Sequence, residues 1–186
     1  MRALTARAAF ATLVFCWAGA ASAQSATDTK TFTVTGTVPA LCVGGTVTGG
    51  NATFDLGVLV DTSTGLLRTN LSAPSKTLTG SFCSARSTIT VAATPVTAQT
   101  FTGTAPTGFS RGVNYTATAA GWTTTAASFT TGQASNPAAV QTRTTAFTGD
   151  ITVSLGNFST DGGVALRLVA DPAYLGNVTV TLAVAS

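Results

Sequence analysis

Few residues of this sequence could do chemistry, and two cysteines are the most informative of them. Cys42 and Cys83 are the only cysteines after an N-terminal segment that ends near residue 23. In an exported, β-rich chain such a pair predicts one structural disulfide. Closing a loop of about 40 residues would remove unfolded-chain entropy worth roughly 4 kcal/mol. Two buried thiols are the alternative. Zinc is not expected, because the chain has no histidine and no glutamate to complete a tetrahedral site.

Groups that could carry catalysis are scarce. Without histidine, a nucleophile would need a lysine or a carboxylate pair to activate it, and Lys30 and Lys76 lie in threonine-rich segments without a recognisable motif. Asp55 and Asp61 are close in sequence, but Asp55 lies in Phe-Asp-Leu-Gly, where a turn hydrogen bond is the expected role. Residues 161–163, Asp-Gly-Gly, are more typical of a turn than of a calcium loop. We therefore expect no enzyme, no cofactor and no metal site.

The N-terminus has the order of features that export signals share. Arg2 and Arg7 form a basic head, an apolar run covers residues 8–20, and a small-x-small cleavage site ends at Ala23. This order predicts a signal peptide over residues 1–23. No later stretch has about 20 consecutive apolar residues, so we expect no integral membrane segment after the signal is removed. The expected location is outside the cytoplasm.

Charge excludes two classes of partner. Two of the nine basic residues lie in the predicted signal, which leaves seven against six aspartates, a net charge of about +1. The remaining basic residues stand singly, with no run that could follow a phosphate backbone or an anionic membrane. Nucleic acid and lipid headgroups are therefore not expected partners.

Strands must position whatever this chain presents, because threonine and valine dominate it and favour pleated structure. Phe32, Val34 and Val38 alternate with threonines, and apolar and small polar residues alternate over residues 178–184. Such alternation predicts strands with one buried face. Further strands are expected over residues 52–58, 76–82, 87–93, 113–119, 122–130, 150–155 and 164–169. No convincing helical period follows the signal, so the predicted fold is all-β, a sandwich or barrel.

About 163 residues remain after the signal, enough for one domain with a real core. The stretch from residue 94 to residue 141 is rich in threonine, alanine and glycine and is where long connections are expected. It contains Trp122, Tyr115 and Phe109, which could form a stacking platform for a sugar. Packing in the core is the alternative interpretation of these three rings, and we favour it.

Several motifs occur in an order that is typical of one protein family. Residues 36–42 read Gly-Thr-Val-Pro-Ala-Leu-Cys, residues 54–57 read Phe-Asp-Leu-Gly, and residues 78–83 read Leu-Thr-Gly-Ser-Phe-Cys, with Ile-Thr-Val at 89–91. This order resembles the first half of chaperone–usher fimbrial subunits, which include type 1 pilins and the spore-coat-U-like and archaic pilins. The resemblance implies an immunoglobulin-like antiparallel sandwich that lacks its last strand, with a cysteine of the first strand bonded to one at the end of the second.

The resemblance also assigns regions and site residues. Residues 24–35 would be an N-terminal extension whose Phe32 and Val34 act as a donor strand, and residues 36–186 would be the pilin-like domain. The groove that accepts a donor would be lined by apolar residues of the first and last strands: Val38, Leu41, Val178, Val180, Leu182 and Val184. Their alternative role is as ordinary core residues of a closed sandwich. The sequence leaves open whether the extension completes a neighbour or its own domain.

The implied function is structural. The chain would be a subunit of an extracellular pilus used in surface adhesion, assembled by donor-strand exchange. Its expected partners are other pilin subunits, a periplasmic chaperone and an outer-membrane usher, and it would pass through the periplasm to the cell surface. The alternative is a secreted or tip-located adhesin, a carbohydrate-binding β-sandwich module.

Overall fold

A computed structural model describes residues 27–185 of the protein. The signal peptide expected over residues 1–23 lies outside the described residues, as do the first three residues of the expected extension. The chain divides after Thr37 into two units, and the unit Val38–Ser186 contains all strands of the described residues.

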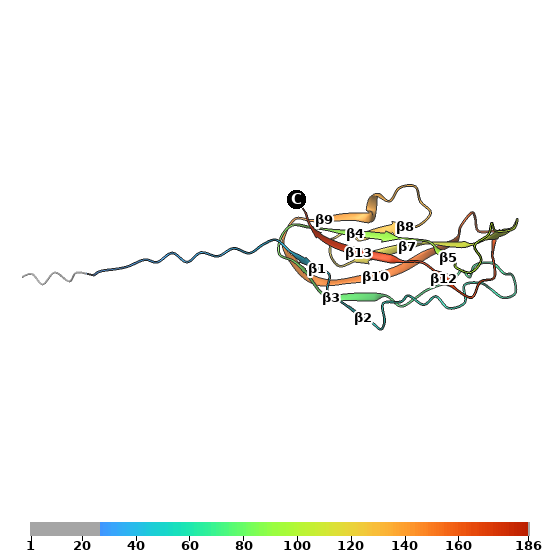
Figure 1. Ribbon diagram of the computed structural model, residues 1–186, viewed down its shortest axis with the longest axis horizontal. Helices are drawn as coiled ribbons and strands as arrows, with labels where there is room; N and C mark the ends of the chain where they lie inside the picture. Colours follow the sequence, from blue (N-terminus) through green and yellow to red (C-terminus); the bar gives the residue numbers. More distant parts are fainter. Residues whose placement is uncertain (1–26, 186) are drawn as a thin grey trace, which may run out of the picture. The chain divides into compact units, whose positions relative to one another are not determined.

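The fold is all-β, as the composition and alternation predict, and the one short helix among residues 27–185 is a 3-10 turn (Figure 1). The elements in chain order are β1 Cys42–Val43, β2 Thr46–Thr48, β3 Lys76–Cys83, β4 Ser87–Ala93, β5 Val96–Ala98, β6 Phe109–Ser110, β7 Gly112–Ala120, β8 Ala127–Thr130, η1 Pro137–Ala139, β9 Val140–Arg143, β10 Phe147–Thr160, β11 Arg167–Leu168, β12 Tyr174–Leu175 and β13 Val178–Val184.

The strands form two main antiparallel sheets. The larger sheet has the order β1-β3-β10-β7-β5-β12, with β2 also paired to β3 and β8 also paired to β7. The smaller sheet has the order β13-β4-β9, and β6 and β11 form a separate parallel pair. The two main sheets pack face to face as a sandwich.

Alternation along each strand builds the core between the two sheets. In β7 the odd-numbered residues from Val113 to Ala119 are buried, and their neighbours carry the polar or small side chains of the outer face. Ile89 of β4 and Ile151 of β10 are fully buried on the facing surfaces. A side-chain period of two therefore places one apolar row of each strand inside the sandwich.

A bulge shifts the alternation within β3. The pairing of β3 with β10 is regular up to Ser81, then slips by one residue before Leu78. Gly80 adopts φ +74° at this point, and its N–H donates to Oδ1 of Asp150 at 2.9 Å. The extra residue lets Leu78 face the core on the same side as Ser81 and Cys83, which strict alternation would not allow.

The predicted disulfide is present. Cys42 and Cys83 are bonded to each other, and they are also direct cross-strand partners of β1 and β3, with their Cα atoms 4.1 Å apart. Cys83 is 2% exposed, so the bond ties the short first strand to the core.

The expected strands at residues 76–82, 87–93, 113–119, 150–155 and 178–184 are confirmed. Two expectations are wrong: residues 52–58 contain no strand, and neither do residues 27–41, where Phe32, Val34 and Val38 alternate with threonine. The strands expected over 122–130 and 164–169 shrink to β8 and β11. Alternation makes a segment suitable for a sheet, but a strand forms only where another strand pairs with it.

Candidate functional site

The last strand, β13, is an edge of the smaller sheet. It pairs with β4 along its whole length, from Val178 opposite Ala93 to Val184 opposite Ser87. Within the described residues, no strand pairs with its other side. An edge of seven residues is long enough to serve as a template for another strand.

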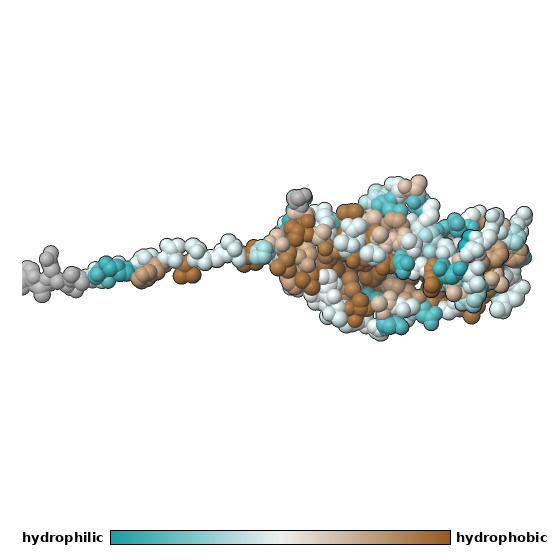
Figure 2. All heavy atoms as spheres, viewed as in Figure 1, coloured by the Kyte–Doolittle hydropathy of each residue, from teal (hydrophilic) through white to brown (hydrophobic). Residues whose placement is uncertain are grey.

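The inward side chains of this edge are apolar and incompletely covered. Val178, Val180 and Leu182 pack against the core but are only half-buried. By contrast, Val91 and Ile89, the β4 partners of Val180 and Leu182, are at most 1% exposed. Figure 2 shows apolar atoms gathered over the region where Figure 1 draws β13, β10 and β3. We call the half-buried line formed by Val178, Val180 and Leu182 the seam.

The backbone N–H and C=O groups of the seam residues point away from β4, toward the free edge of the sheet. The N–H of Thr94 bonds to the carbonyl of Asn177, and the N–H of Ala185 bonds to the carbonyl of Arg86, so these pairs are the hydrogen-bonded ones of the ladder. Bonded and non-bonded pairs alternate in an antiparallel ladder. The even-numbered residues from 178 to 184 therefore direct their N–H and C=O groups away from β4, toward the free edge. The same residues offer an added strand both backbone bonds and apolar contact.

Across from the seam, β1 and β3 of the larger sheet lie next to β13. Leu78 is half-buried and packs against the core beside the bulge, and its cross-strand partner Val47 is 39% exposed. Neither residue belongs to the groove that the sequence predicts. The signal that could have found Leu78 is Gly80, because a glycine inside a strand pattern often marks a bulge.

The other predicted groove and donor residues lie elsewhere. Val38 and Leu41 precede β1 and are exposed, at 84% and 38%, and Val184 is 40% exposed at the end of β13. Phe32 and Val34 are exposed in the unit that ends at Thr37. The structure therefore brings together three of the six predicted groove residues, the three that form the seam.

Tyr115 holds the beginning of β13 from the opposite sheet. Its hydroxyl donates to the carbonyl of Asn177 at 3.1 Å, and its ring is 2% exposed. Burial raises the pKa of this hydroxyl to about 12. The phenol thus stays protonated and remains a donor across the physiological range.

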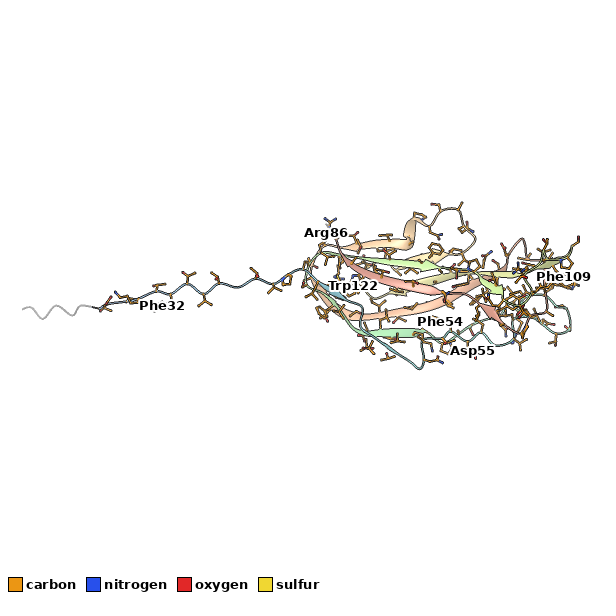
Figure 3. The ribbon with its side chains drawn as sticks, in the orientation of Figure 1. Phe32, Phe54, Asp55, Arg86, Phe109 and Trp122 are labelled. Carbon is orange, nitrogen blue, oxygen red and sulfur yellow. A yellow bond between two sulfur atoms is a disulfide. The ribbon has the colours of Figure 1, made fainter. Side chains whose placement is uncertain are left out.

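The three aromatic rings that could have formed a sugar-stacking platform, the less favoured interpretation, do not meet at the surface. Trp122 and Tyr115 are buried, at 0% and 2% exposed, and only Phe109 reaches solvent. Figure 3 places Trp122 and Phe109 at opposite ends of the sandwich. The Trp122 indole donates to the Ser87 hydroxyl at 3.2 Å and meets the Phe147 ring edge-on at 5.2 Å. The favoured interpretation, core packing, is confirmed for the two buried rings.

The carboxylates make turn contacts. Asp55 accepts the N–H of Gly57 at 2.8 Å, as its motif predicts. Asp61 accepts a hydroxyl bond from Ser63 and backbone bonds from Ser63 and Thr64, which together lower its pKa. Residues 27–185 contain no group of three or more His, Cys, Asp or Glu side chains placed to hold a metal. Over the same residues, no helix has the length and apolarity to cross a membrane.

Comparisons with known proteins identified no relative of this chain. No family model, no curated protein and no solved structure matches this chain. The geometry of the β13 edge and the resemblance of the motifs therefore carry the functional argument.

Proposed function

We propose that this protein is a structural subunit of an extracellular fibre, assembled by adding a strand of another subunit to the free edge of β13. The observation that carries the proposal is the seam, where Val178, Val180 and Leu182 are half-buried on a long edge strand with outward backbone groups. Strand addition would cover those side chains and satisfy those backbone groups in one step.

The donor in this proposal is the N-terminal segment of a neighbouring subunit. Phe32 and Val34 alternate with threonines, as a strand requires if one of its faces is to enter an apolar seam. Residues 27–40 form no strand, so the backbone ahead of Leu41 is not committed to a sheet. The N-terminal segment of one subunit would therefore pair with the free β13 edge of another.

The family-level details belong to this proposal as well. An immunoglobulin-like sandwich that lacks its last strand would leave such an edge open, as in the chaperone–usher subunits that the motifs resemble. A free edge of this kind is an aggregation hazard during export. A periplasmic chaperone would cover it before an usher passes the subunit to the growing pilus. Export by the N-terminal signal and a role in surface adhesion complete the proposed function.

The test is polymerisation of the chain that begins at Gln24. We expect multimers that resist heat and detergent, and we expect them to disappear when residues 24–35 are deleted. Val180→Asp should also abolish them, because a carboxylate in the seam would be buried without a partner. Thr181→Asp is the matched control, since it is one residue away on the exposed face of the same strand. A stable monomer, or multimers that tolerate both the deletion and Val180→Asp, would refute the proposal.

A further inference from the structure

One end of the sandwich carries exposed apolar side chains beside the disulfide. Val43 and Phe82 are direct cross-strand partners and are 44% and 38% exposed. Leu41, also 38% exposed, is fixed next to them, because its N–H bonds to the Ser84 hydroxyl and its carbonyl accepts the Ser84 N–H. An open hollow of about 520 Å³ is lined by Phe82, Cys83, Ala146, Phe147 and Thr148. We call Leu41, Val43 and Phe82 the disulfide-end patch.

The other end carries a hollow of similar size. About 420 Å³ of open space is lined by Thr94, Pro95, Thr97, Gln99, Leu175, Gly176 and Asn177. Leu175 of β12 is 62% exposed there, and three residues later β13 begins. A Cβ on Gly176 would lie 2.9 Å from the carbonyl oxygens of Thr94 and Pro95, so the backbone passes too close for any larger residue. We call this space the Leu175 hollow. It lies at the Val178 end of the seam, and the close backbone contact at Gly176 makes it a defined part of the fold.

The direction of an added strand decides which surfaces meet. Antiparallel pairing is slightly more stable per residue than parallel pairing. A donor antiparallel to β13 would have its C-terminal end at Val178, so the chain would leave the seam beside the Leu175 hollow. Only residues 36–40 then connect the donor segment, residues 24–35, to Leu41, the first anchored position of its own domain. Five residues span at most about 18 Å.

Because the connector is short, the domain that donates the strand must lie close to the domain that accepts it, which gives the two a second surface of contact. Resting on the proposed function, we propose that the disulfide-end patch of one subunit packs into the Leu175 hollow of the next copy. All the side chains named for the two surfaces are uncharged, and the Leu175 hollow offers the apolar side chains of Leu175 and Pro95 next to polar ones such as Gln99. Strand addition links the subunits, and this end-to-end contact sets the angle between them and slows their separation.

The experiment separates the end contact from the seam by measuring two quantities on the chain that begins at Gln24. The first is the dissociation rate of its multimers in denaturant, which depends on both contacts. The second is the affinity of the chain for a synthetic peptide of residues 24–35, which lacks the connector and so depends on the seam alone. Leu175→Asp should speed multimer dissociation at least about tenfold, because its carboxylate would be buried against an apolar patch. It should leave peptide affinity within about twofold of the wild type.

Two further variants make the result specific. Val140→Asp, which changes a 51% exposed valine of β9, is the matched control and should alter neither quantity. Val43→Lys in one subunit should restore slow dissociation from Leu175→Asp in the other, because opposite charges would then meet. Unchanged dissociation of Leu175→Asp multimers would overturn the end contact and leave the proposed function standing. So would equal loss of peptide affinity, which would place Leu175 in the seam. Wild-type chains that neither bind the peptide nor form multimers would overturn both proposals.

Discussion

The two edge strands of the smaller sheet differ in length and in the side chains they turn inward. β9 has four residues, and the residues facing the core are Gln141, opposite the buried Ile89, and Arg143. β13 has seven residues, and its core-facing side chains from Val178 to Leu182 are all apolar. The first edge is short and polar, and the second is long and apolar.

The β9 side of the sandwich is closed by a cluster built around a cation. The Arg143 guanidinium lies 3.5 Å from the centre of the Phe147 ring and donates to the Trp122 carbonyl at 2.7 Å. Inward-pointing charges are one of the devices by which proteins protect sheet edges. The β9 edge of the same sheet has this protection. The size of the core therefore does not by itself explain why the β13 edge is apolar and unprotected. Within the described residues, the sandwich is therefore protected at the β9 edge and open at the β13 edge.

The largest expected effect is on the closed side. Trp122→Ala should lower the free energy of unfolding by about 3–5 kcal/mol, because a fully buried indole would leave a cavity. Urea unfolding followed by circular dichroism measures this change. Phe109→Ala, at a 40% exposed aromatic residue, is the control and should cost about 1 kcal/mol or less. Similar losses in both variants would mean that Trp122 does not organise the core.

The next effect concerns the charge at the closed edge. Arg143→Ala should lower the free energy of unfolding by about 1–3 kcal/mol, since it removes a charge-assisted hydrogen bond to Trp122 and a cation–π contact with Phe147. The same urea titration measures it. Thr142→Ala is exposed on the same strand and should stay within about 0.5 kcal/mol of the wild type. The variant should also self-associate more readily through β9, which sedimentation velocity can detect; an unchanged sedimentation profile would contradict a protective role.

The regular part of the fold was predictable because local alternation dictates it. β4 has the same bounds as the strand expected at residues 87–93, and β13 matches the one expected at 178–184. The seam residues Val178, Val180 and Leu182 could be named for the same reason. Each of these segments carries its apolar row on one face, and the sheet buries that face.

The features that the sequence did not predict depend on contacts between residues that are far apart in the chain. The expected strand at residues 52–58 has the right composition, but no neighbouring strand pairs with it. Leu78 was missed because the bulge at Gly80 moves it to the other face. Trp122 was expected in a strand and instead lies before β8, where Ser87 and Arg143 bond to it from elsewhere in the chain. Local periodicity does not show which distant segments pair as strands or which distant side chains meet.

A smaller effect tests how the open edge is held. Tyr115→Phe should cost about 1 kcal/mol of unfolding free energy, because the Asn177 carbonyl keeps the Thr94 N–H but loses the Tyr115 hydroxyl, its second donor. Hydrogen exchange should show faster opening of β13 than of β9. The pH dependence gives a second readout. Because the folded pKa is about 12 and the ordinary value is 10, the stability that this phenol contributes is complete below pH 10 and is lost as the pH rises through about 12. If β9 and β13 opened equally in the variant, Tyr115 would not be specific to the open edge.

The smallest expected effect lies at the end of the sandwich near the Leu175 hollow. Partial burial raises the pKa of Asp171, but backbone N–H groups of Phe101, Ala173 and Thr100 lower it further, so the net shift is downward. A carboxylate with a lowered folded pKa stabilises the fold above its unfolded pKa, about 4, and this stability is lost as pH falls through the folded pKa. Asp171→Asn should therefore melt a few degrees below the wild type at pH 6, and the difference should shrink as the pH falls below about 4. Thermal unfolding across this range measures it. A gap that stays constant down to pH 2 would show that the charge of Asp171 does not hold this end, and the Leu175 hollow would then owe its shape to packing at Gly176 alone.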